Sequence, residues 1–134
     1  MKTNDDGIVD LVDLRALLSS DKNKTLVSLM FVNNEIGTIL EVEKIGVICK
    51  EYKALFHTDA VQAVGHFDID LESLAVDFLA ASAHKFHGPK GIGFAYFKKG
   101  FGVKPMLYGG TEIKIKIKIV IRFYLHFVFK PRRR

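Results

Sequence analysis

The stretch "SAHKFHGPKG", residues 82–91, combines side chains that can take part in covalent chemistry. Ser82, His84 and Lys85 stand at the end of an apolar run and directly before a glycine-proline break. A lysine amine can attack a carbonyl group when its surroundings activate it, and a nearby hydroxyl and imidazole can bind an anionic group. The same residues also suit an ordinary polar turn after a buried strand. This stretch alone does not decide between the two interpretations.

Polar side chains also follow two earlier apolar runs. They are Asn33, Asn34 and Glu35 after the first run, and His57, Asp59 and Gln62 in and after the second. In open α/β sheets, ligands bind at the carboxyl ends of the strands, so we expect the three sets to converge on one site. Asp59 and Lys85 together suit a ligand with a pyridinium nitrogen and a carbonyl group, because such a nitrogen needs a carboxylate partner and a lysine can hold the carbonyl group. The histidine at 57 is left open between a packing role and a place in the wall of the site.

The elements that must position these residues follow from the pattern of apolar residues. We expect helices at 10–19 and 41–53, strands at 25–32, 54–60, 76–81 and 91–99, a turn or helix at "VQAVG", and a short helical piece in "DLESLAVDFLAAS". The last strand is bounded by glycines and is expected to run antiparallel to its neighbour. Strands separated by helices indicate the α/β class.

Composition and charge narrow the possible functions. The chain has 134 residues, of which 49% are hydrophobic and 26% charged, which is typical of one globular domain. Eight of the 20 Lys and Arg residues lie in 113–134, which has no acidic residue, so residues 1–112 carry 12 basic and 15 acidic side chains. A basic tail on an acidic body argues against nucleic-acid binding by the whole protein.

Neither a secretory signal nor a membrane span is expected. The start, "MKTNDDGIVD", lacks an apolar core, and the apolar run "IVIRFYLHFVF" has 11 residues, whereas a spanning helix needs about 20. A soluble, cytoplasmic protein is therefore expected. The single cysteine, Cys49, excludes an internal disulfide and a cysteine-rich metal site, and no metal site is predicted. Its position on the same helical face as Val42, Ile45 and Ile48 predicts a buried side chain rather than a reactive thiol.

Four motifs in order resemble the pyridoxal-phosphate-dependent cysteine desulfurases of the iron–sulfur-cluster and nitrogen-fixation group, within the class V aminotransferases. They are "VSLMFVNNEIGTI", "FHTDAVQAVG", "SAHKFHGPKGIG" and "LYGGTE", and the likeness runs from about residue 5 to residue 112. It implies the large, cofactor-binding domain of the aspartate-aminotransferase-like fold, here truncated at both ends. Residues 1–112 would be a partial pyridoxal-phosphate-binding domain and residues 113–134 a divergent basic tail rich in Ile and Lys.

The resemblance also implies a role for each polar side chain. Lys85 corresponds to the lysine that holds pyridoxal phosphate as a Schiff base and moves protons at the substrate Cα. Asp59 corresponds to the carboxylate that faces the pyridine nitrogen and keeps it protonated. Gln62 would reach the phenolic oxygen of the ring, with Asn34 beside the same edge. Two further residues would donate hydrogen bonds to the phosphate, and these are Ser82 and His84.

The sequence departs from the family outside these motifs. Family members are about three times as long and carry, before this region, a glycine/threonine phosphate loop and a histidine that stacks on the cofactor. After it they carry a phosphate-binding segment for the neighbouring subunit, a catalytic cysteine on a mobile loop and an arginine for the substrate carboxylate. Cys49 does not match the position of that cysteine. The resemblance therefore implies conversion of L-cysteine to L-alanine for iron–sulfur cluster assembly, by a homodimer that passes sulfur to scaffold proteins, but no activity of this chain alone.

Other functions are compatible with the sequence. Each polar residue, taken singly, suits a plain structural role, such as Asp59 as an N-cap. A selenocysteine lyase or a small-substrate class V aminotransferase would share these motifs, and a truncated, non-catalytic interaction unit is an alternative of another class. The "PRRR" end and the alternating Ile and Lys residues also fit a polyanion or membrane-surface binder. As an amphipathic strand without a partner, the tail is a predicted aggregation hazard. It could also be a foreign end, such as read-through into unrelated coding sequence.

Overall fold

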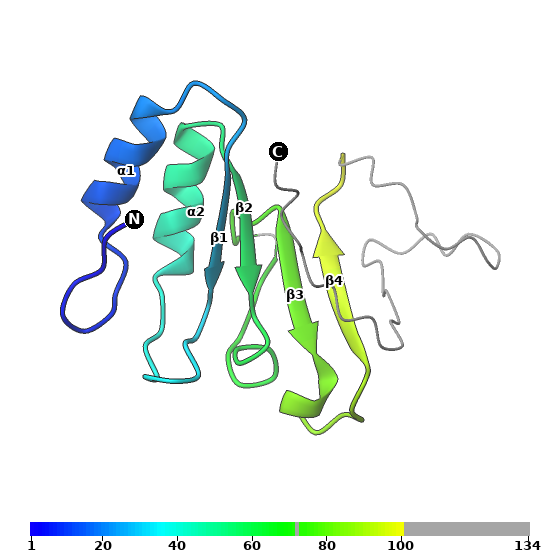
Figure 1. Ribbon diagram of the computed structural model, residues 1–134. Coiled ribbons are helices and arrows are strands. Elements are labelled where there is room, and N and C mark those ends of the chain that lie inside the picture. Colours follow the sequence, from blue (N-terminus) through cyan, green and yellow to red (C-terminus); the bar gives the residue numbers. More distant parts are fainter. Residues whose placement is uncertain (72, 101–134) are drawn as a thin grey trace, which may run out of the picture.

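The computed structural model describes residues 1–71 and 73–100, which form a four-stranded sheet with helices against it (Figure 1). The "LYGGTE" motif, the expected domain boundary at 112 and the tail 113–134 lie outside the described residues. The elements, in chain order, are α1 (Leu11–Ser20), β1 (Leu26–Met30), α2 (Val42–Glu51), β2 (Leu55–Asp59), β3 (Phe78–Ser82), the 3₁₀ helix η1 (Ala83–Lys85) and β4 (Gly93–Phe97).

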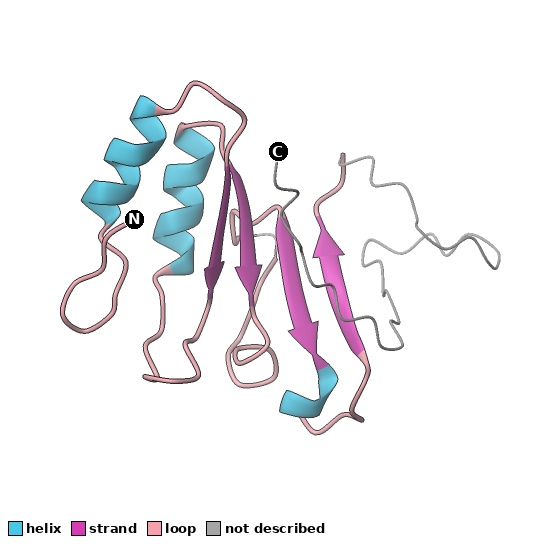
Figure 2. Ribbon diagram, in the orientation of Figure 1, coloured by secondary structure: helices cyan, strands magenta, loops and turns pink. Residues whose placement is uncertain are grey.

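The strands lie in the order β1-β2-β3-β4, and the first three are parallel. Strand β4 runs antiparallel to β3, as the glycine-bounded alternation of 91–99 predicts. Met30 is the register partner of Asp59, and Asp59 is in turn the partner of Ala80. The carboxyl ends of β1, β2 and β3 consequently meet at one edge of the sheet, and the loops that follow them gather there (Figure 2).

The two faces of the sheet have different surroundings, because side chains alternate along each strand. Val27 and Phe56 are register partners on one face, where they join a core cluster with the buried residues of both helices. Ser28 and His57 are partners on the opposite face, where Ser28 is exposed and His57 half-buried. His57 and Asp59 therefore lie on the face away from the helices, whereas Phe56 and the buried Thr58 lie on the core face.

The helices form where local signals agree with burial. Helix α1 begins after Asp10, whose carboxylate accepts hydrogen bonds from the backbone N–H groups of Val12 (2.8 Å) and Asp13 (3.1 Å), as a good N-cap does. Helix α2 buries Ile45, Ile48 and Cys49, and Cys49 is only 1% exposed. The predicted burial of the cysteine and both predicted helices are confirmed.

The short helical piece expected before β3 is not a helix in the described residues. Leu74 N–H donates to the carbonyl of Asp70 (3.0 Å), and the described residues next to position 72 form turns. Leu74 and Val76 are both buried, at 7% and 1% exposure, so burial of these side chains beneath the sheet governs the path of this segment. The "VQAVG" segment likewise forms turns. Within the described residues, no helix combines the length and the apolar character needed to cross a membrane.

Candidate functional site at the carboxyl edge of the sheet

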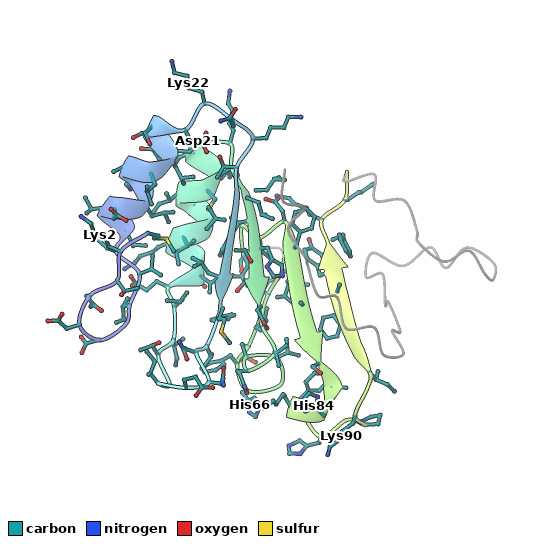
Figure 3. The ribbon with its side chains drawn as sticks, in the orientation of Figure 1. Lys2, Asp21, Lys22, His66, His84 and Lys90 are labelled. Atoms are coloured by element: carbon teal, nitrogen blue, oxygen red, sulfur yellow. The ribbon has the colours of Figure 1, made fainter. Side chains whose placement is uncertain are left out.

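The edge where the three parallel strands end carries all six predicted site residues. Asn34 is in the loop after β1, and Gln62 is in the turn after β2. Asp59 is the last residue of β2 and Ser82 the last of β3, directly before η1 with its histidine and lysine. Figure 3 shows His66, His84 and Lys90 at this end of the molecule, and Asp21 and Lys22 at the opposite end.

Asp59 is held by its own neighbourhood. Its Oδ1 accepts a hydrogen bond from the backbone N–H of Val61 (2.9 Å), and its backbone carbonyl accepts one from Phe31 N–H (2.8 Å). The first bond gives Asp59 the local capping role that the simplest interpretation of the sequence proposes, although it caps a turn and not a helix. Capping does not exclude a second role, because a carboxylate has two oxygens and about four acceptor positions.

Ser28 and His57 form a hydrogen-bonded pair on the same face as Asp59. The Ser28 Oγ lies 2.8 Å from His57 Nδ1, across the β1–β2 register. Burial lowers the pKa of His57, and the negative charge of Asp59 partly offsets this effect. The open question about His57 is thereby narrowed: it is a hydrogen-bonded side chain beside Asp59 rather than a residue packed in the core.

The segment that carries Lys85 is anchored at its start. Ala83 is 8% exposed, and its backbone N–H donates to the carbonyl of Ile92 (2.9 Å), which ties η1 to the beginning of β4. The Ser82 Oγ lies 2.8 Å from His84 Nδ1, so a hydroxyl and an imidazole stand together beside the lysine. The side chain of Lys85 is exposed. An exposed amine next to a hydroxyl and an imidazole suits the capture of an anionic carbonyl compound.

The predicted residues are brought to one edge but do not all contact one another. The Nδ2 of Asn34 donates to the carboxylate of Glu35, its neighbour in the chain, and Asn34 itself is exposed. Gln62 is half-buried in the turn that the bonds from Ala63 and Val64 N–H to the Ala60 carbonyl close. Their placement agrees with roles at the rim of the site.

One residue at this edge was not singled out from the sequence. His66 Nε2 lies 3.0 Å from the backbone carbonyl of Lys85, 19 residues further along the chain. The sequence offers only a weak signal for it, a polar residue directly after Gly65 at the end of a motif.

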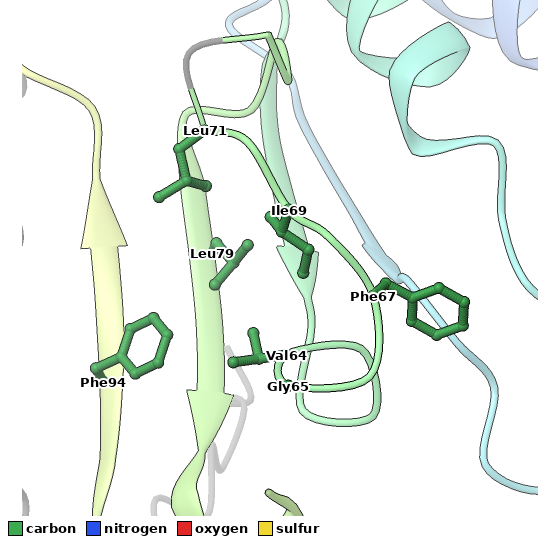
Figure 4. Close-up of a pocket in the computed structure, with 7 residues that line it drawn as sticks. All are labelled: Val64, Gly65, Phe67, Ile69, Leu71, Leu79 and Phe94. Carbon is green, nitrogen blue, oxygen red and sulfur yellow. The ribbon is translucent and has the colours of Figure 1, made fainter.

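An apolar cavity of about 220 Å³ lies on the other face of the sheet (Figure 4). Its lining residues are Val64, Gly65, Phe67, Ile69, Leu71, Leu79 and Phe94. Leu79 is the register partner of the core residue Thr58, so the cavity lies on the helix-bearing face and away from Asp59. These lining residues carry no side chain that could hold or transfer a proton, and the candidate site is therefore the polar edge and not this cavity.

Comparisons with known proteins place this edge in a family context. The family described as "Aminotransferase class-V" matches residues 1–120. Cysteine desulfurase IscS of Clostridium botulinum is 46% identical over 112 residues, which are 84% of this chain and 28% of that protein. The chain thus spans little more than a quarter of the length of this curated relative.

Two solved structures have the same fold. A NifS-like protein from Rickettsia africae matches with a TM-score of 0.73 and 38% identity, over 82% of this chain and 31% of that one. The structure of "SspA in complex with cysteine" matches with a TM-score of 0.70 and 34% identity, over 78% of this chain and 30% of that one. These neighbours confirm the expected partial α/β domain.

Proposed function

Because this chain belongs to the class V aminotransferase family, we propose that its polar edge is the pyridoxal-phosphate-binding part of a cysteine desulfurase. The observation that carries this proposal is the convergence of Asp59, at the end of β2, with the segment that bears Lys85, at the end of β3. A carboxylate and a lysine at neighbouring strand ends are the two protein groups that pyridoxal phosphate requires at opposite sides of its ring.

The donor set fits the cofactor. Ser82 and His84 offer a hydroxyl and an imidazole within 2.8 Å of each other, which suits a phosphate group. Asp59 is oriented by the Val61 N–H through one oxygen, which leaves acceptor capacity for a pyridinium N–H. When bound, pyridoxal phosphate supplies an electron sink that stabilises negative charge at the substrate Cα.

Each of the predicted site residues has a defined role in this proposal. The Nζ of Lys85 carries the cofactor covalently and afterwards takes and returns a proton at the substrate Cα. Asp59 keeps the proton on the pyridine nitrogen. Gln62 and Asn34 serve the phenolic edge of the ring, where the half-buried Gln62 is the better shielded of the two.

L-Cysteine is the proposed substrate, in keeping with the names of the relatives and with the cysteine complex of the structural neighbour SspA. Desulfuration breaks the Cβ–S bond of the substrate, and the sulfur passes to a protein thiol, which gives L-alanine and a persulfide. Cys49 does not suit that thiol, because it is 1% exposed and burial raises its pKa to about 11. Cys49 is the single cysteine in residues 1–134, so the accepting thiol in this proposal lies outside these residues.

The remaining elements of the proposal rest on the family resemblance. They are a homodimer, sulfur transfer to an iron–sulfur scaffold protein, and a cytoplasmic location.

The test is covalent trapping at Lys85. The full chain is mixed with pyridoxal phosphate, reduced with borohydride and digested, and the pyridoxyl label is mapped by mass spectrometry. We expect the label on Lys85 in preference to Lys90, an exposed lysine five residues further along, and we expect Lys90→Ala to leave it unchanged. Asp59→Asn should lower the yield at Lys85. An even label over the surface lysines, the same in Lys85→Ala, contradicts the proposal.

A second measurement addresses the sulfur step. The isolated chain should release no sulfide from L-cysteine above the background of free pyridoxal phosphate, since Cys49 is buried and protonated. Sulfide release that is lost in Cys49→Ser would show that the buried thiol becomes accessible and that its assignment as a structural residue is wrong.

A further inference from the structure

We propose that His66 is a positioning residue for Lys85, holding the backbone of the segment that carries the lysine. This inference rests on the proposed role of Lys85 in binding pyridoxal phosphate. The contact joins two loops that follow neighbouring strands, namely the turn after β2 and the 3₁₀ helix after β3.

The contact itself is a hydrogen bond between a side chain and the backbone. His66 Nε2 donates to the Lys85 carbonyl over 3.0 Å. Lys85 is the last residue of η1, and carbonyl groups at a helix end lack partners within the helix. His66 therefore satisfies an acceptor that the short helix leaves open.

A second contact beside the first strengthens the connection. Gly65 has φ +81°, and a Cβ at this position would come within 2.5 Å of the Cβ of Phe86. Gly65 and His66 therefore approach Lys85 and Phe86, two consecutive residues on each side. A paired approach of this kind fixes the direction of the backbone better than one hydrogen bond does.

The other bonds of the lysine segment explain why this connection matters. Phe86 and Gly88 N–H both donate to the Ala83 carbonyl, at 3.0 and 2.8 Å, and the buried Ala83 is tied to β4. These bonds all converge on the start of the segment. His66 holds its middle from the opposite side, next to the Cα of the reactive lysine. Because the lysine stem is long and flexible, the position of its backbone determines which volume the amine explores.

The bond does not require a particular charge on His66. The neutral ring with its proton on Nε2 and the doubly protonated ring both donate from Nε2. The connection is therefore expected to persist across neutral pH, unlike a contact that depends on an imidazolium charge.

The first test is amide hydrogen exchange in the full chain without cofactor, followed by NMR at pH 6 and pH 8. We expect His66→Ala to speed exchange at Phe86 and Gly88 by about 2- to 10-fold, the range for loss of one net hydrogen bond. His66→Gln keeps an N–H donor and should restore most of the protection. His87→Asn is the matched control, because His87 is also exposed and its φ of 66° suits asparagine.

The second test is the trapping of pyridoxal phosphate by borohydride, scored as the ratio of label on Lys85 to label on Lys90. His66→Ala should lower this ratio several-fold, while His66→Gln and His87→Asn retain it. The positioning role is wrong if His66→Ala leaves both exchange and ratio unchanged, or if His66→Gln behaves like His66→Ala. Absence of any preference for Lys85 in the unmodified chain contradicts the proposed function instead, and the exchange data still decide whether His66 holds the segment.

Discussion

Gly65 and Gly91 allow the steric contact beside the candidate site to be measured separately from backbone strain. Both glycines are exposed and have nearly the same φ, +81° and +79°. A Cβ at Gly91 would have no heavy atom of the described residues within 4 Å, whereas a Cβ at Gly65 would meet Phe86 Cβ at 2.5 Å and Cγ at 3.3 Å. Replacing each glycine with alanine therefore imposes the same backbone penalty but only one clash.

The expected losses in the free energy of unfolding follow from the backbone penalty and the steric clash. A left-handed conformation costs an alanine about 1–2 kcal/mol, and the lower entropy of the unfolded chain returns about 0.4–1 kcal/mol. We therefore expect Gly91→Ala to lower the free energy of unfolding by about 1 kcal/mol. Gly65→Ala adds the cost of overpacking, about 1–3 kcal/mol, which gives a loss of about 2–4 kcal/mol. This is a large part of the roughly 5–15 kcal/mol that stabilises an ordinary domain.

The assay is urea unfolding of the full chain and of each variant, followed by circular dichroism. In a Phe86→Gly background the clash with the phenylalanine Cβ is absent, so the extra cost of Gly65→Ala over Gly91→Ala should disappear. In the otherwise unmodified chain, Gly65→Ala should also lower trapping of pyridoxal phosphate at Lys85, because relief of the clash moves Phe86 and the lysine before it. Equal losses for the two single variants would refute the reasoning, since the predicted difference comes only from the contact with Phe86.

Three further predictions concern buried or half-buried side chains. Thr58 is 0% exposed and its Oγ1 has no hydrogen-bond partner among the described residues, so Thr58→Val should raise the free energy of unfolding by about 1 kcal/mol in urea titrations, while Thr58→Ser should lower it. Burial lowers the pKa of His57 below its ordinary 6.5, partly offset by Asp59, so the folded chain takes up a proton less readily than the unfolded one and loses stability as the pH falls below about 6.5. His57→Gln should reduce that loss, and identical urea midpoints at pH 7.5 and 5.5 in the unmodified chain would contradict it. Burial raises the pKa of Cys49 from 9.0 to about 11, so a thiol reagent should react slowly with the folded chain at pH 8 and rapidly once urea unfolds it. The free energy of unfolding should also fall above pH 9, where the thiol of the unfolded chain loses its proton first. Rapid labelling of the folded chain would show that Cys49 is accessible.

The sequence predicted those parts of the fold that depend on local patterns. In the described part of the chain, the period of apolar residues located both helices and all four strands, since α2 buries one face and the strands carry compact apolar runs. It failed before β3, where the described residues of the expected helical piece form turns and not a helix. There Asp70 and Ser73 favour turns over helix interiors, and Leu74 and Val76 are buried in the core.

The sequence predicted which residues lie at the candidate site but not which of them contact one another. Polar residues after apolar runs identified the strand ends, and the parallel sheet brings those ends together. The Ser28–His57 pair depends on register, and a shift of one residue would place the two side chains on opposite faces. The His66–Lys85 contact joins two turns, which have no periodic pattern that could reveal it.

The five residues of β2 show how stability and chemistry are separated in this chain. Phe56 is fully buried against the helices and Thr58 is fully buried on the same face, whereas His57 and Asp59 are half-buried on the opposite face. Because alternation along a strand keeps these pairs apart, the side chains of His57 and Asp59 do not interrupt the core, and the core does not exclude ligands from Asp59. Substitutions of Phe56 should therefore act through folding and substitutions of Asp59 through binding, even though the two residues are only three positions apart. The binding residues of β2 keep their positions only while its core face holds the register with β1 and β3. The packing of α2 on Phe56 is therefore required for the geometry of the site.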